Sequence, residues 1–150
     1  MTPFGAVIRR LGSVALLLLA SCGGCNKSPF ALVPVSGTVL LDGKPLAGGV
    51  INFQPIATGT STNGGPGSTA RINAEGGYSL ATISGLPGVV VGKHRVKIYS
   101  YSPESPAVTD GAKAMTQREQ VPARYNYTSD VTFDVPAAGT DKADFSIKSK

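Results

Sequence analysis

Turn-forming residues recur at short intervals along the chain from Val33 onward, and they leave little room for a long helix. Asp42-Gly43 is a strong hairpin signal, because both residue types tolerate the positive φ that a type I′ turn requires. Residues 74–77 (AEGG) predict a second hairpin, and residues 86–88 (LPG) interrupt the chain again. The chain has 19 Gly and 11 Pro in 150 residues. Turn-forming residues at this frequency favour short strands joined by turns.

Between the turns, apolar and polar residues alternate as they do in half-buried strands. In residues 93–101 (KHRVKIYSY), His94, Val96 and Ile98 share one face, and the basic residues and Tyr99 share the other. We expect residues 50–54 to return from the Asp42-Gly43 turn, and residues 69–73 and 78–82 to form the second hairpin. The seven predicted strands are residues 35–41, 50–54, 69–73, 78–82, 93–101, 131–135 and 143–148. Their spacing predicts an all-β, antiparallel, seven-stranded β-sandwich.

The first 21 residues have the pattern of an export signal. Arg9 and Arg10 supply positive charge, residues 14–20 (VALLLLA) form a short apolar run, and the small residue Ser21 follows. The run is shorter than the roughly 20 apolar residues that cross a bilayer, so a permanent transmembrane helix is the weaker interpretation. We expect a helical signal peptide over residues 1–21, a flexible tether over 22–32 and one domain over 33–150.

The end of this segment, Leu19-Ala20-Ser21-Cys22, resembles the bacterial lipobox. The resemblance implies cleavage between Ser21 and Cys22, a diacylglyceryl group on the Cys22 thiol and acylation of the new amino terminus. Two or three acyl chains hold a protein stably on a membrane, whereas one holds it only marginally. The alternative is an ordinary secretory signal without lipid. Gly23 stands where an Asp often retains such lipoproteins at the inner membrane, which favours the outer membrane of the cell envelope.

Cys25 forms a C-x-x-C pair with Cys22, a spacing also found in redox and zinc sites. The sequence has no second cysteine pair, and His94 is its one histidine, so we expect no metal site and no cofactor. Cys25 itself has no role that the sequence assigns.

The order of motifs over residues 34–148 resembles carboxypeptidase regulatory-like, or transthyretin-like, domains. Residues 34–39 (PVSGTV) and 42–46 (DGKPL) are similar to their opening strand and turn, 74–80 (AEGGYSL) to their second hairpin, and 88–96 (GVVVGKHRV) to a later strand. The resemblance implies a prealbumin-like sandwich with an accessory, binding or structural role. Asn73 replaces a Thr-Asp pair common in the family, so no cation site is expected at that turn.

The residues that could carry chemistry favour a non-enzymatic protein. The hydrolases and iron dioxygenases that share related folds need more than one histidine, and this chain has one. A glycosidase-type pair of carboxylates stays open, because such pairs form in three dimensions. The formal charge of +5 falls to +3 without Arg9 and Arg10, and the basic residues are scattered. We therefore expect no nucleic-acid partner.

Four tyrosines, Tyr99, Tyr101, Tyr125 and Tyr127, are the candidate ligand-binding residues. Their amphipathic rings suit contacts with carbohydrate or protein, although tyrosine is also an ordinary strand former. The sequence therefore predicts a lipid-anchored cell-envelope protein with a structural or accessory binding role, held to the membrane by the lipid on Cys22. The alternative is a glycan- or peptide-binding module that uses the tyrosine and basic face of residues 93–101.

Overall fold

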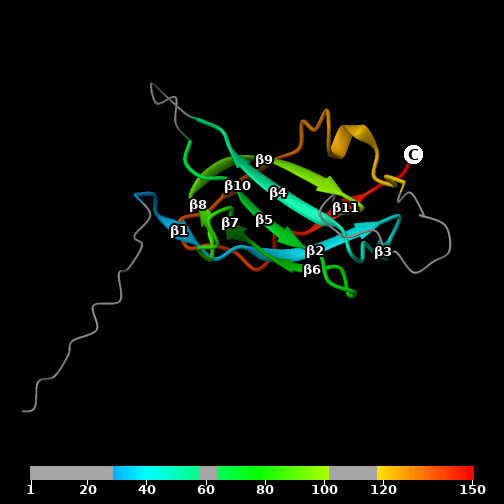
Figure 1. Ribbon diagram of the computed structural model, residues 1–150, viewed down its shortest axis with the longest axis horizontal. Helices are drawn as coiled ribbons and strands as arrows, with labels where there is room; N and C mark the ends of the chain where they lie inside the picture. The colour runs from blue at the N-terminus through cyan, green and yellow to red at the C-terminus, as the bar shows by residue number, and fades with distance from the viewer. Residues whose placement is uncertain (1–28, 58–63, 102–117) are drawn as a thin grey trace, which may run out of the picture.

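The computed structural model describes residues 29–57, 64–101 and 118–150, and the chain in these ranges is built almost entirely from β-strands (Figure 1). The predicted all-β fold class is therefore confirmed. The predicted signal peptide, the cleavage residue Ser21, the lipidation residue Cys22 and Cys25 lie outside the described residues. The elements are β1 (Leu32–Val33), β2 (Ser36–Leu41), β3 (Lys44–Pro45), β4 (Val50–Pro55), β5 (Ser68–Arg71), β6 (Gly77–Ser79), β7 (Ala81–Thr82), β8 (Val89–Val90), β9 (Gly92–Tyr99), the 3-10 helix η1 (Ala123–Tyr125), β10 (Thr132–Val135) and β11 (Phe145–Ile147).

The largest sheet has the strand order β10-β9-β4-β5-β7, and each neighbouring pair in it is antiparallel. Its strand β9 shows the alternation that the sequence predicts: His94, Val96 and Ile98 are buried, whereas Lys93 and Arg95 are exposed. An apolar face thus meets the core and a basic face meets water, as a period of two residues requires.

A second sheet has the order β11-β2-β3, with β6 paired to the first half of β2. Here the expectation of a wholly antiparallel structure is wrong, because β11 runs parallel to β2. The cause is the return of the chain to the start of β2. The Ser36 amide donates to the Thr140 carbonyl, and the Thr140 amide donates to the Pro34 carbonyl, both at 2.9 Å. From that position the chain can only enter β11 in the direction of β2.

The Asp42-Gly43 turn forms as predicted, with φ of 51° and 82° at its two residues. Its return strand is β3, however, and the prediction that residues 50–54 pair back onto β2 is wrong. Pro45 lacks an amide proton, so it cannot donate a hydrogen bond that would extend the pairing of β3 with β2. The chain then crosses to the larger sheet, where β4 lies between β9 and β5 and aligns six residues with β9.

The second predicted hairpin forms its turn, and its two strands pair only at the ends far from that turn, where Thr69 lies opposite Ala81. The turn closes through the Asn73 amide and the Gly77 carbonyl at 2.9 Å. Beyond it, the predicted strand 78–82 divides at the buried Leu80: β6 joins β2 in one sheet, and β7 joins β5 in the other. A strand that changes sheets in this way forms a corner between two packed layers. The described residues therefore hold eleven strand segments instead of seven.

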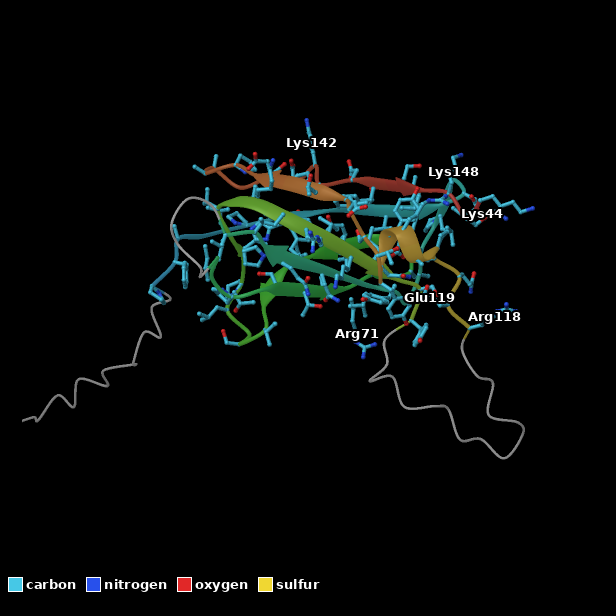
Figure 2. All side chains as sticks on the ribbon, turned by 90° about the horizontal axis from the view of Figure 1, so that it is seen from above. Lys44, Arg71, Arg118, Glu119, Lys142 and Lys148 are labelled. Atoms are coloured by element: carbon cyan, nitrogen blue, oxygen red, sulfur yellow. The ribbon has the colours of Figure 1, made fainter. Side chains whose placement is uncertain are left out.

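The two larger sheets share one apolar core. Phe53 of β4 is fully buried and meets Phe145 of β11 with ring centroids 6.2 Å apart, and Phe133 of β10 at 5.7 Å. Figure 2 shows β2 and β11 as one layer and β4, β5 and β9 as the layer facing it. A small third sheet, β1 with β8, covers one end of these layers (Figure 1). In the part of the chain that the structure describes, no helix is long and apolar enough to span a membrane.

Candidate functional site

Three of the four candidate tyrosines come together at the end of β9. The rings of Tyr99 and Tyr127 meet edge to face, with centroids 5.6 Å apart. Tyr101 lies close enough to Tyr127 for a side-chain hydrogen bond to raise the pKa of Tyr127. Tyr127 is 65% exposed, and Tyr99 and Tyr101 are half-buried beneath it. We call Tyr99, Tyr101 and Tyr127 the tyrosine cluster.

The fourth tyrosine has a different environment. Tyr125 ends η1, and the guanidinium carbon of Arg124 lies 4.9 Å from the centre of its ring. The same guanidinium donates to the carbonyl oxygens of Lys148 and Lys150. Tyr125 also packs partly against the core. Its position is thus explained by structural contacts, and the structure does not join it to the tyrosine cluster.

Glu119 lies beside the tyrosine cluster, and the sequence analysis does not single it out. Its Oε1 atom accepts hydrogen bonds from the amides of Ser100 and Val121, both at 2.9 Å. The Gln120 amide donates to Ser100 Oγ at 2.9 Å, which ties the same two segments together. The other oxygen, Oε2, is buried and has no hydrogen-bond partner among the described residues. No sequence signal marks this carboxylate, because its donors are backbone amides, one of them in a segment 19 residues away.

Electrostatics keep the phenols of Tyr99 and Tyr127 protonated. Burial, followed by the charge of Glu119, raises the pKa of Tyr99 above its usual value. The hydrogen bond with Tyr101 is the first cause that raises the pKa of Tyr127, and Glu119 acts in the same direction. At neutral pH these groups can therefore donate hydrogen bonds and offer ring faces, which suits ligand contact better than proton abstraction.

The outward face of β9 continues the cluster as a polar surface. Arg95 and Lys97 lie directly opposite Gln54 and Asn52 of β4 in the sheet, and residues directly opposite share a face. Lys93 lies opposite Asp134 of β10 in the same way. The face therefore combines cations, amides and one carboxylate, with the tyrosines at its end.

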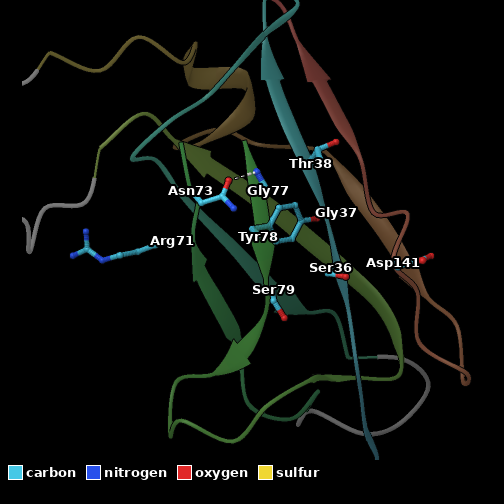
Figure 3. A pocket seen from close by; sticks show the side chains of 9 residues that line it. All are labelled: Ser36, Gly37, Thr38, Arg71, Asn73, Gly77, Tyr78, Ser79 and Asp141. Atoms are coloured by element: carbon cyan, nitrogen blue, oxygen red, sulfur yellow. Dashed lines mark hydrogen bonds between the residues drawn. The ribbon is translucent and has the colours of Figure 1, made fainter. Parts of the chain in front are cut away.

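A separate hollow of about 470 Å³ lies over β2 and β6. Figure 3 shows the Tyr78 ring at its centre, next to Gly37, and the charged ends of Arg71 and Asp141 turned away from it on opposite sides. The Tyr78 hydroxyl donates to the Ala143 carbonyl, and Asn73 Oδ1 accepts from the Gly77 amide at 2.7 Å. Burial raises the pKa of Tyr78 far above its usual value. The polar groups of Tyr78 and Asn73 are bonded within the domain, so these side chains do not offer a ligand in the hollow a set of free hydrogen-bonding groups.

His94 is buried in the core, on the face of β9 that it is predicted to share with Val96 and Ile98. One ring nitrogen, Nε2, lies 2.7 Å from the Val90 carbonyl, and its ring centroid lies 5.7 Å from that of Phe53. The other nitrogen, Nδ1, is buried without a partner in the described residues. Burial is the main cause that lowers the pKa of this imidazole, and the hydrogen bond to Val90 opposes it. The side chain is therefore neutral and withdrawn from solvent.

Within residues 29–57, 64–101 and 118–150, no three His, Cys, Asp or Glu side chains gather as metal ligands. A scan against protein-family models, a search of curated proteins and a search of solved structures each found no match to this chain. The resemblance of the turn motifs to transthyretin-like domains therefore stays a prediction from the residues.

Proposed function

We propose that this chain is an exported lipoprotein of the cell envelope, in which lipid on Cys22 anchors an all-β domain with a structural or accessory binding role. The observation that carries this function is Leu19-Ala20-Ser21-Cys22, placed directly after the apolar run of residues 14–20. The position of β1 supports it, because the first strand starts at Leu32, ten residues after Cys22. A short tether would then join lipid and domain.

The finer fold that we propose is a prealbumin-like sandwich. Two features support it: one core shared by two sheets, and a type I′ turn at the position of the D-G-x-P-L motif. We place the protein at the outer membrane on the strength of Gly23. Its partners are the membrane and an envelope glycan or protein, and no nucleic acid, catalytic step, metal or cofactor belongs to this function.

The two cysteines provide a matched test of the anchor. We expect the wild-type chain and Cys25→Ser to incorporate radiolabelled palmitate and to stay with membranes after carbonate washing. Cys22→Ser should lose the label, because thiol acylation and signal cleavage both depend on Cys22, and one or no acyl chain does not hold a protein stably. The measurements are palmitate autoradiography and fractionation of the expressing cells. Palmitate on Cys22→Ser, or its loss from Cys25→Ser, would contradict the proposed anchor.

The tyrosine cluster favours a second candidate function, recognition of a glycan or peptide. Tyr127 exposes most of its ring above Tyr99, and Arg95, Lys97, Asn52 and Gln54 add hydrogen-bonding groups along the same face of the sheet. Aromatic rings beside such groups are typical of sugar- and peptide-binding surfaces.

Truncating the exposed ring tests this candidate without threatening the core. If a glycan array or peptide library yields a ligand, Tyr127→Ala should weaken its binding about 30-fold, the loss typical of an aromatic hot spot. Thr128→Ala, an exposed neighbour, should bind as wild type does. Titration calorimetry gives both dissociation constants. Equal affinity in Tyr127→Ala and wild type would remove the tyrosine cluster from the ligand site.

A further inference from the structure

One end of the domain carries no charged residue and presents apolar side chains. Four segments meet there: residues 29–36, 64–67, 83–92 and 135–140, and none of them contains Asp, Glu, Lys, Arg or His. We call these four segments the tether end. β1 and β8 pair within it, the Thr140 amide donates to the Pro34 carbonyl, and the Ile83 amide donates to the Gly67 carbonyl at 3.1 Å.

Charged residues border the tether end at Lys93, Asp134 and Asp141, and others lie farther from it. Figure 2 shows Lys44, Lys148, Arg118 and Glu119 toward the opposite end of the sheets, and Lys142 between the two ends. The nearest cation on β9, Lys93, lies opposite Asp134 across the strand pair. The tether end is thus a neutral surface, and bringing it against an apolar phase removes no ionised side chain from water.

Ile83 is the most prominent apolar side chain of the described residues. It is 79% exposed, and Val91, in the same end, is 37% exposed. Phe30 and Leu86 lie half-buried in the same segments. A single exposed aliphatic residue is common on protein surfaces, but here it stands on a charge-free end that also holds the start of the domain.

The length of chain before the domain limits what this end can face. Seven peptide steps join Cys22 to Pro29, so they span at most about 25 Å even when fully extended. The described chain enters the domain at the tether end, where β1 lies (Figure 1). With lipid on Cys22, this end would stay within one short tether of the membrane. Tethering raises the effective concentration of the domain at the membrane surface, so that a small apolar contact is sufficient to hold this end against the bilayer.

We propose that the tether end docks onto the lipid bilayer, with Ile83 entering the interface between headgroups and acyl chains. The inference rests on the proposed lipid anchor and extends it: the anchor fixes the distance of the domain, and the docked end fixes its orientation. The tyrosine cluster and the charged end then face away from the membrane. Because the contact is apolar, we expect it to be insensitive to salt.

A fluorescent label at each end of the domain tests this orientation. The lipidated full chain, carrying Cys25→Ser and either Ser84→Cys or Lys44→Cys, is labelled with an environment-sensitive dye and placed in phosphatidylethanolamine–phosphatidylglycerol vesicles. Both positions are exposed; Ser84 follows β7 and Lys44 lies in β3, and Figure 1 shows these two strands toward opposite ends of the domain. Doxyl-labelled lipids should quench the label at residue 84 strongly and the label at residue 44 little. Adding Ile83→Ser should lower the ratio of docked to undocked domain about tenfold, as removal of one buried aliphatic side chain does.

The outcomes separate the two proposals. A protein that does not float with the vesicles contradicts the anchor, and the docking with it. A protein that floats but shows equal quenching at residues 84 and 44, or unchanged quenching with Ile83→Ser, leaves the anchor standing and overturns the docking. Quenching that requires membrane extract and is missing in pure-lipid vesicles would identify a protein partner instead, and also overturns the docking onto lipid. Ile83→Ser should unfold at the wild-type temperature, because the side chain is exposed.

Discussion

Replacing Gly37 by alanine is expected to lower the free energy of unfolding by about 3 kcal/mol or more. Gly37 lies in β2 opposite Tyr78 of β6, and a Cβ at this position would overlap the backbone of Ala143. Backbone atoms cannot move aside as the end of a flexible side chain can, so β2 and the segment that leads into β11 would have to separate. The same shift would break the hydrogen bond from the Tyr78 hydroxyl to the Ala143 carbonyl. Guanidinium titration followed by far-ultraviolet circular dichroism measures the loss.

Gly67→Ala is the matched control for this substitution. A Cβ at Gly67 would lie 3.4 Å from the Phe53 carbonyl oxygen and 3.5 Å from Ile83 Cδ1, which is ordinary contact. Its unfolding free energy should stay within about 1 kcal/mol of wild type. If Gly37→Ala behaves like Gly67→Ala, the close approach of β2 to Ala143 does not contribute to stability.

Acidification is expected to destabilise the domain through His94. The imidazole is buried and its folded-state pKa is lowered, mainly by burial, while Val90 and Asp134 act in the opposite direction. The imidazole of the unfolded chain therefore becomes protonated near pH 6.5, whereas that of the folded chain becomes protonated only at a lower pH. Stability from this group is complete above that pH and falls as the pH drops below it, by at most about 1.4 kcal/mol per pH unit.

His94→Gln separates this effect from the titration of carboxylates. Glutamine places an amide nitrogen where it can donate to the Val90 carbonyl, as His94 Nε2 does at 2.7 Å, and it does not titrate. Thermal unfolding followed between pH 7.5 and 4.5 should show a steeper decline for wild type than for His94→Gln below about pH 6.5. Parallel curves for the two proteins would show that His94 is not the titrating group.

Local sequence patterns predict the faces and turns of this fold but only part of its strand pairing: the second predicted hairpin pairs as β5 with β7, whereas other partners differ from the prediction. The alternation around Val96 and the positive φ at Asp42 and Gly43 follow from a few neighbouring residues. Pairing depends on distant residues: β4 leaves its hairpin for β9, and the strand after Gly77 divides at Leu80. No repeat or spacing near these positions encodes which sheet each half joins.

The candidate site shows the same limit. The sequence identifies Tyr99 and Tyr127 as candidates by residue type, and the structure brings their rings into edge-to-face contact. Tyr125 is only two residues from Tyr127, but it ends η1 and packs on Arg124. In irregular chain, a spacing of two residues does not predict direction as it does in a strand. The backbone amides that bind Glu119 likewise carry no sequence signature.

The parallel pairing of β11 with β2 also affects the order in which the domain folds. Asp144 Oδ1 accepts hydrogen bonds from the amide and hydroxyl of Thr38, across 106 residues, and Asp42 accepts one from the Ser149 amide across 107. Contacts between residues so far apart in sequence form late, because a long loop must close first. In the export that we propose, a chain that enters a channel from its amino-terminal side would keep this sheet open until residues 144–149 have followed. Pairing of β11 with β2 would then complete folding only after translocation.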